Sequence, residues 1–171
     1  GKLIKVYDDT KNIARTLHPE ASPALSTLYT LDEVLEQELP TDLPFGEENR
    51  ASIKIYNRDT LVAAEELVSS GYRPLVLNFA SKWKAGGGVT GGAMAQEEEL
   101  FRRSSYPLCC NHTFYPMADE KFNITKVLVM KDTNYNLMDS KTRFHADFIA
   151  LAALKNPQTN KHGHLSGKNY T

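Results

Sequence analysis

A glycine-rich segment that follows a short apolar run constrains the fold of this chain more than any other stretch. The apolar run, Leu75–Phe79, has the length of a buried strand. Five glycines lie between residues 86 and 92, and residues 96–101 then read as the start of a helix. Glycine reaches positive φ, and the unpaired amides of a first helical turn face outward toward an anion. This order of strand, glycine loop and helix start predicts a phosphate-binding site in an α/β fold.

The carboxylates at this helix start allow two interpretations. A first-turn glutamate stabilises the helix macrodipole, and this alone explains an acidic run. Spacing favours a second interpretation, because GGG at 86–88 precedes QEE at 96–98 by seven residues. This string resembles the signature of poly(ADP-ribose) glycohydrolases. LNFAS at 77–81 and RRSSYP at 102–107 resemble the microbial-type branch of that family.

Apolar spacing predicts a βαβ unit that leads into the glycine loop. Ser52–Tyr56 alternates apolar and polar residues as a strand does. A helix capped by Asp59 or Thr60 is expected to run to Ser70, with Gly71 at its natural stop. The strand at 52–56 should then lie parallel to Leu75–Phe79 with a right-handed crossover. The glycine loop would begin at the carboxyl end of the second strand, where open α/β sheets bind ligands.

The rest of the chain gives weaker patterns. The ordered elements that we expect are a helix capped by Asp9 or Thr10 and ending at Leu17, strands at Ser26–Leu31 and Ile124–Met130, and a helix from Asp32 to Leu39. Segment 147–154 reads as a strand or a short helix, and the family resemblance favours a strand. The irregular segments that we expect are a loop at 40–50, an ordered loop at 106–121, a turn-rich stretch at 132–143 and a mobile tail at 155–171.

The family resemblance implies a macrodomain-like α/β fold, a three-layer α/β/α sandwich around a mixed sheet. We expect residues 51–171 to form the catalytic core and residues 1–50 a helical or irregular extension. The family continues with another helix, a strand and a second glycine-rich loop, so we expect this core to lack its C-terminal part. A complementary C-terminal segment of the same protein is then an expected partner. The strands near Leu75 and Ile124 should be central, and Phe148–Leu154 should lie at or near an edge.

Composition excludes several classes of function. The net charge is −1, so the basic excess of a nucleic-acid-binding protein is missing. No apolar run approaches the ~20 residues of a membrane helix, and the first residues do not resemble a signal peptide. Cys109 and Cys110 are adjacent, which favours free thiols in a reducing compartment, cytoplasmic or nuclear. The histidines lack metal-site spacing, so we expect neither a metal nor a cofactor.

The resemblance implies roles for the residues of the QEE string. Glu98 matches the family's catalytic acid, which protonates the leaving ribose oxygen and deprotonates the attacking water. Glu97 would hydrogen-bond a ribose hydroxyl, and Gln96 would position the loop or the ligand. The substrate would be ADP-ribose polymer or an ADP-ribosylated protein.

Further residues are expected to contact the substrate. They are Gly86, Gly87, Gly88, Val89, Asn78, Phe79 and Ser81. Phe79 has two interpretations, a core residue or an adenine stacker, and the first is favoured. Ser81 stands where the family usually has an asparagine that is expected to contact the terminal ribose. Glu99 is expected to cap the helix or face solvent.

Two other functions compete with the glycohydrolase hypothesis. The first is a module that binds ADP-ribose without turnover, which Ser81 and the expected incompleteness of the core both favour. The second is a nucleotide-phosphate hydrolase that uses the glycine loop as a phosphate cradle. That loop lacks the Lys-Ser/Thr ending of a P-loop, and no acidic cluster suggests magnesium.

Overall fold

The computed structural model describes residues 1–38, 51–152 and 159–162. Its helices are α1 (Lys2–Leu17), α2 (Leu31–Leu35), α3 (Thr60–Ser69), α4 (Gln96–Arg103) and α5 (Tyr106–Cys109). Its strands are β1 (Ser26–Thr30), β2 (Leu75–Ala80), β3 (Lys121–Val129) and β4 (Phe144–Ala152). The loop expected at 40–50 and most of the tail expected at 155–171 lie outside the described residues.

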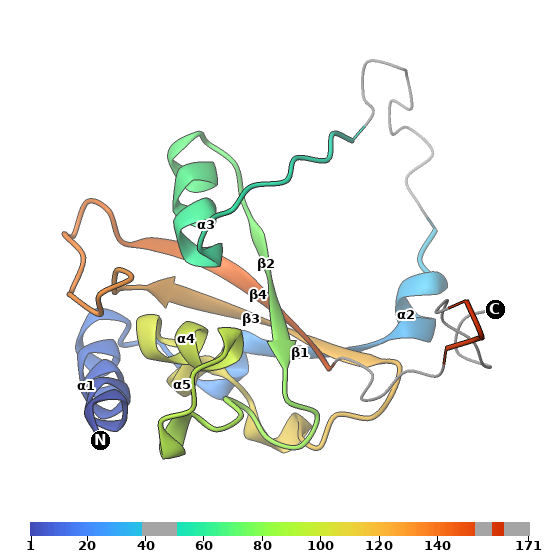
Figure 1. Cartoon of the computed structure of the whole chain (residues 1–171), viewed down its shortest axis with the longest axis horizontal. Coiled ribbons are helices and arrows are strands. Elements are labelled where there is room, and N and C mark those ends of the chain that lie inside the picture. The colour runs from blue at the N-terminus through green and yellow to red at the C-terminus, as the bar shows by residue number, and fades with distance from the viewer. Residues whose placement is uncertain (39–50, 153–158, 163–171) are drawn as a thin grey trace.

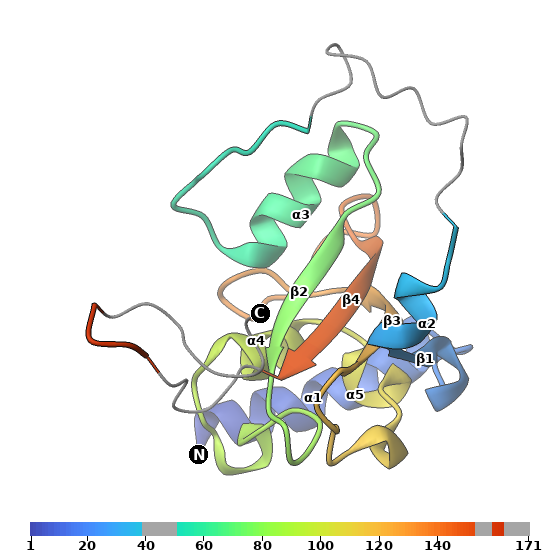
Figure 2. The ribbon, with the colours of Figure 1, turned by 90° about the vertical axis from the view of Figure 1, so that its right-hand side faces the viewer.

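The strands form one mixed sheet in the order β1-β3-β4-β2. β2 lies parallel to β4, and β3 runs antiparallel to both of its neighbours. Figure 2 shows β2 and β4 side by side and pointing the same way. The mixed sheet is therefore confirmed, and so is the strand interpretation of segment 147–154.

The predicted central place of β2 in the sheet is wrong. Within the described residues β2 is an edge strand, whereas β4 lies between β3 and β2. The prediction of a central β3 is confirmed. An apolar run shows that a strand is half or fully buried, but it does not show which neighbours the strand pairs with.

The strand predicted at Ser52–Tyr56 is also wrong. These residues have no regular secondary structure, and Ile53 and Ile55 are 91% and 93% exposed. The predicted parallel pair with β2 does not form, and the described strand that lies parallel to β2 is β4. Alternation of apolar residues satisfies the local requirement for a strand, but a strand also needs a hydrogen-bonding neighbour and a surface to cover.

The helix after this segment agrees with the prediction. Asp59 caps α3 by accepting hydrogen bonds from the amides of Leu61 and Val62, and Gly71 follows with a φ of 85°. Asp59 also accepts two 2.9 Å hydrogen bonds from Arg103, which ties the start of α3 to the end of α4.

The two N-terminal helices differ from their predicted bounds. α1 begins at Lys2, and Thr10, a predicted cap, lies inside it as a buried residue. The Thr10 hydroxyl donates to the carbonyl of Val6 in its own helix and lies 2.6 Å from the carbonyl of Arg102 in α4. α2 ends at Leu35, and its cap is Thr30 in a reciprocal capping box with Glu33.

One core joins the sheet to the helices that carry the glycine loop. Buried side chains of α3, α4 and α5, including Leu61, Phe101 and Tyr106, pack in one cluster with Val76 of β2 and Phe148 of β4. Figure 1 shows β2 running into the loop that leads to α4. The segment expected as loop at 106–121 contributes α5 and a short 3-10 helix, His112–Phe114, as well as irregular residues.

The opposite face of the sheet, which we call the outer face, is open in the described residues. Leu75, Leu77 and Phe79 of β2 are 54%, 37% and 63% exposed, and Leu151 of β4 is 42% exposed. The prediction of Phe79 as a core residue is therefore wrong. Among the helices of residues 1–38, 51–152 and 159–162, none is long and apolar enough to cross a membrane.

Candidate active site

The glycine loop folds back onto the first turn of α4. Gly86 and Gly87 have φ values of 75° and 51°, a region that other residues rarely adopt. A β-carbon on Gly86 would lie 2.9 Å from the Phe101 ring, and one on Gly88 would lie 2.6 Å from the side chain of Ala93. The loop can therefore approach α4 this closely only where it lacks side chains.

Glu97 joins the loop, β2 and α4. Its side chain is buried, and its two carboxylate oxygens accept hydrogen bonds from the amides of Gly86 at 3.1 Å and Ser81 at 2.8 Å. The Asn78 side-chain amide lies 3.4 Å from the first of these oxygens. Burial raises the pKa of Glu97 above its ordinary value, and the neighbouring Glu98 charge adds to the rise. The hydrogen bonds oppose this shift because they stabilise the ionised form.

Glu98 lies beside Glu97 and is also buried. One carboxylate oxygen accepts a 2.8 Å hydrogen bond from the amide of Gly88, and the other accepts a 3.0 Å bond from the amide of Ala95. A β-carbon on Gly87 would lie 2.6 Å from the first Glu98 oxygen and 3.0 Å from a Glu97 oxygen. The absence of a side chain at Gly87 therefore lets the loop backbone pack directly against both carboxylates.

Gln96 binds the free edge of β2. Its side-chain carbonyl accepts a 3.0 Å hydrogen bond from the amide of Phe79, and its side-chain amide donates to the carbonyl of Leu77 at 2.6 Å. These two bonds copy the pairing that a neighbouring strand would supply. Gln96 therefore fixes the start of α4 relative to β2.

The other predicted substrate contacts divide into buried and open residues. Asn78 and Val89 are buried, so their side chains support the loop from below. Ser81 accepts hydrogen bonds from the amides of Trp83 and Lys84 through its hydroxyl, which closes the first turn of the loop. Phe79 is exposed on the outer face.

A cluster behind the loop was not found from the sequence. The buried Arg102 donates to Glu99 at 2.9 Å and to the carbonyl of Ala93 within the loop. The Tyr135 hydroxyl donates to the same Glu99 oxygen at 2.6 Å. The prediction that Glu99 caps the helix or faces solvent is therefore wrong, since its carboxylate holds Arg102 against the loop. The i, i+3 spacing of Glu99 and Arg102 could have predicted their ion pair. Nothing in the sequence indicated that Tyr135 would bind the same carboxylate.

A second unpredicted contact lies beneath Asn78. The side-chain amide of Asn78 lies 3.3 Å from the hydroxyl of Tyr106. Tyr106 is fully buried and packs on Phe101 and Phe148. Glu97, Asn78 and Tyr106 thus form a chain of polar contacts that enters the core. In the part of the chain that the structure describes, no group of histidine, cysteine and acidic residues is arranged to hold a metal.

Comparison with known proteins assigns the family. The sequence profile of the microbial-type PARG catalytic domain matches residues 9–147, which is most of the chain. The chain belongs to this family, in which PARG stands for poly(ADP-ribose) glycohydrolase. No curated protein sequence matches the chain.

Solved structures give the same fold. Poly(ADP-ribose) glycohydrolase from Thermomonospora curvata is 23% identical, with a TM-score of 0.69 over 89% of this chain and 64% of that one. The same protein bound to the inhibitor ADP-HPD is 23% identical, with a TM-score of 0.68 over 89% and 63% of the two chains. The Deinococcus radiodurans glycohydrolase in complex with ADP-ribose is 22% identical, with a TM-score of 0.59 over 80% and 59%. The macrodomain-like α/β fold is therefore confirmed, and the chain spans less than two thirds of the length of these structures.

Proposed function

We propose that this chain carries the catalytic glutamates of a poly(ADP-ribose) glycohydrolase that hydrolyses ribose–ribose O-glycosidic bonds. The observation that carries the proposal is the pair of buried carboxylates, Glu97 and Glu98, held by backbone amides beneath Gly87. Two glycohydrolase structures with this fold hold ADP-ribose and the inhibitor ADP-HPD, which supports ADP-ribose polymer as the ligand class.

In the proposed reaction Glu98 acts as general acid and then as general base. Its carboxyl proton passes to the leaving ribose oxygen as the bond from that oxygen to the anomeric carbon breaks. Water then attacks the anomeric carbon, and its proton returns to Glu98, so the residue ends as it began. The net change is the addition of water across the glycosidic bond. Positive charge on the sugar in the transition state is stabilised by the adjacent carboxylate of Glu97.

Glu97 also has a positioning role in this proposal. Its bonds to Ser81 and Gly86 fix both ends of the first half of the loop. A ribose hydroxyl that binds Glu97 would therefore be held at a fixed place relative to Glu98. Gly86, Gly87 and Gly88 would bring backbone atoms against the ribose and diphosphate, because none of them carries a side chain.

The substitution Glu98→Gln tests the assignment in the full-length protein. We expect release of ADP-ribose from polymer to fall by about 10²- to 10⁴-fold, the usual contribution of a general acid–base group. Glu66→Gln is the matched control, since Glu66 is exposed on α3 and, among the described residues, forms an ion pair with the exposed Arg58 alone. Thermal unfolding of both variants checks that the fold is retained. Wild-type rates in Glu98→Gln would show that another residue is the general acid.

A binding module without turnover is the second candidate. Both oxygens of Glu98 already accept backbone hydrogen bonds, as they would if the residue only tied the loop to the helix. Under this alternative, the wild-type protein would bind ADP-ribose in calorimetry but would not shorten the polymer. Ser81 also favours it, because a serine stands where the family is expected to place a ribose-binding asparagine.

A further inference from the structure

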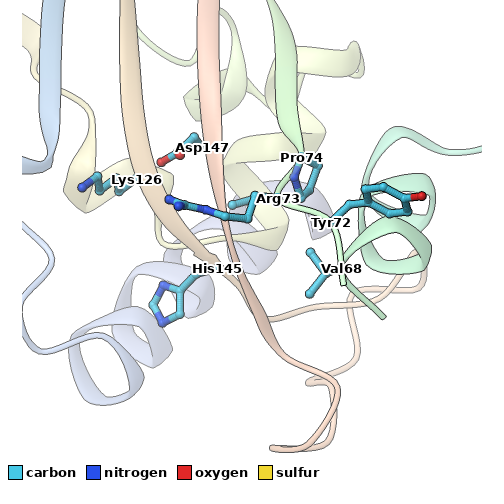
Figure 3. Close-up of a pocket in the computed structure, with 8 residues that line it drawn as sticks. Val68, Tyr72, Arg73, Pro74, Lys126, His145 and Asp147 are labelled. Carbon is cyan, nitrogen blue, oxygen red and sulfur yellow. The ribbon is translucent and has the colours of Figure 1, made fainter. Parts of the chain in front are cut away.

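A cavity lies at the end of β2 away from the glycine loop, where β2 and β4 begin. Its volume is about 330 Å³. Figure 3 shows that its walls come from α3, the turn before β2, β3 and β4. Because β2 rises by about 3.3 Å per residue, Leu75 lies roughly 17 Å along the strand from Ala80, where the glycine loop begins. The cavity is thus separate from the candidate active site.

Two basic side chains in this cavity form no ion pair in the described residues. Arg73 and Lys126 both line it, and neither forms a hydrogen bond or ion pair through its side chain in the described residues. Every other arginine of the described residues donates a hydrogen bond or pairs with a carboxylate. A guanidinium carries five donors in a planar fork that fits phosphate oxygens, and a lysine adds a point charge. Arg73 and Lys126 therefore offer an anion site on a chain whose net charge is −1.

A carboxylate lies between the two basic residues. Asp147 is the direct cross-strand partner of Lys126 on β3 and of Leu75 on β2, which places it on the outer face beside the first residue of β2. It also lines the cavity without closing an ion pair to Arg73 or Lys126. An ionised carboxylate only accepts hydrogen bonds, so a ligand that contacts Asp147 must bring donors such as hydroxyl groups.

The wall on the α3 side is apolar, and His145 of β4 completes the lining. Val68 and Pro74 line the cavity there, and Figure 3 shows the ring of Tyr72 directed away from Arg73, Lys126 and His145. A ligand that fits these walls has an anionic group, neighbouring hydroxyls and a compact apolar surface. A pentose phosphate supplies the first two, and the C–H groups of its ring offer a small apolar surface to Val68 and Pro74.

We propose that this cavity binds a sugar phosphate, with Arg73 and Lys126 on the phosphate and Asp147 on the sugar hydroxyls. The ligand is either a free pentose phosphate or a ribose–phosphate unit of ADP-ribose polymer remote from the bond being cleaved. The second source rests on the proposed glycohydrolase function, whereas binding of the sugar phosphate itself does not.

Ribose 5-phosphate is the probe, added to the isotopically labelled full-length protein while amide resonances are followed. We expect saturable shifts at residues 72, 73, 126 and 145–147. Inorganic phosphate should bind at least about 10-fold more weakly, and ribose should cause no shifts there, because each lacks half of the recognised groups. Equal binding of phosphate and ribose 5-phosphate would overturn the assignment of a sugar site. Absence of shifts at these residues would overturn the whole proposal.

Variants assign the contacts. Arg73→Gln should weaken ribose 5-phosphate binding by about 10-fold or more, as expected when a charge-assisted bidentate contact is lost. Asp147→Asn should weaken ribose 5-phosphate but leave or improve inorganic phosphate binding, because it removes the negative charge. Lys5→Gln is the control, since Lys5 is an exposed lysine of α1, which contributes no residue to this cavity or to the glycine loop. Unchanged binding in both Arg73→Gln and Asp147→Asn would contradict the assigned contacts.

Polymer hydrolysis distinguishes the two sources. A higher KM for long polymer in Arg73→Gln, with an unchanged kcat, would identify the polymer as the ligand. If the KM for long polymer is unchanged in Arg73→Gln while the wild-type protein binds ribose 5-phosphate, the ligand is a free sugar phosphate. If wild-type protein does not hydrolyse polymer at all, the proposed function fails while the ribose 5-phosphate titration still decides this proposal.

Discussion

The two ends of β2 carry sites of opposite charge and different construction. At the carboxyl end, Glu97 and Glu98 are 4% and 6% exposed, and every carboxylate oxygen accepts a backbone hydrogen bond. At the amino end, Arg73 and Lys126 are exposed and their charged groups have no partner in the described residues. One site is fixed by the main chain, and the other depends on long, flexible side chains.

This difference has an energetic consequence. Backbone amides that point at a carboxylate are ordered by the fold itself, so a ligand or transition state meets them already in place. Arginine and lysine side chains lose about 1.5–2 kcal/mol of rotamer entropy each when a ligand orders them. We therefore expect small geometric changes to reduce turnover strongly at the carboxyl end, and substitutions at the amino end to change affinity only.

Among substitutions outside the two glutamates, the largest expected effect comes from Gly87→Ala. The added methyl group would lie 2.6 Å from a Glu98 oxygen and 3.0 Å from a Glu97 oxygen, so the loop or the carboxylates must move. A displacement of about 1 Å near reacting groups costs on the order of 100-fold in rate, and we expect that loss in polymer hydrolysis. The measurement is kcat on polymer for Gly87→Ala and the wild-type protein, and a thermal unfolding curve checks that the variant is folded.

Gly71→Ala at the other end of β2 is the matched control for that change. Gly71 also has a positive φ, 85°, but a β-carbon there would meet nothing within 4 Å. Gly71→Ala should therefore cost about 1 kcal/mol of stability through backbone strain and leave turnover unchanged. Equal losses of activity in the two variants would show that backbone strain, and not contact with the carboxylates, is the cause.

A smaller effect is expected behind the loop, from Glu99→Gln. This change removes the counter-charge of the buried Arg102, which donates to the loop carbonyl of Ala93. We expect kcat to fall by about 10-fold, with little change in KM, because Glu98 is displaced while the binding surface remains. Tyr135→Phe removes one hydrogen bond to the same carboxylate and should cost less.

Glu66→Gln again provides the comparison for this ion pair. Glu66 and Arg58 are each 54% exposed, so loss of that pair should change stability by less than about 1 kcal/mol and turnover not at all. An unchanged kcat in Glu99→Gln, measured well below its unfolding midpoint, would mean that Arg102 stabilises the fold without positioning the loop.

The parts of the fold that depend on local chemistry were predictable from the sequence. Asp59 and Gly71 mark the ends of α3, and the glycines of the loop mark where the chain turns back onto α4. These signals work because caps and positive φ values are properties of single residues and their near neighbours. The QEE string was placed on a helix start for the same reason.

The parts that depend on distant partners were not predictable. Alternation at Ser52–Tyr56 indicates a strand only if another strand lies beside it. The parallel neighbour of β2 is instead β4, in which Asp147 pairs with Leu75 from 72 residues further along the chain. The surroundings of Asn78 are a second example. Its burial between Glu97 and Tyr106 depends on how β2 packs on α4 and α5, and the sequence around Asn78 does not indicate these neighbours. A single sequence contains no signal for such contacts.

The smallest expected effect concerns the pH dependence of stability and compares two glutamates of opposite environment. Burial raises the pKa of Glu97 above its ordinary value of 4.5, so the folded state holds this proton more tightly than the unfolded state. The contribution of Glu97 to the free energy of unfolding is then complete below pH 4.5 and is lost as the pH rises through the folded-state pKa. Glu33 behaves in the opposite way, because hydrogen bonds from Thr30 lower its pKa. The contribution of Glu33 to stability is therefore present above pH 4.5 and lost at lower pH.

Denaturant unfolding across this pH range tests the comparison. As the pH rises, the wild-type protein should lose stability relative to Glu97→Gln and gain stability relative to Glu33→Gln. The same sign for both variants would show that burial of Glu97 does not outweigh the amide hydrogen bonds that it accepts.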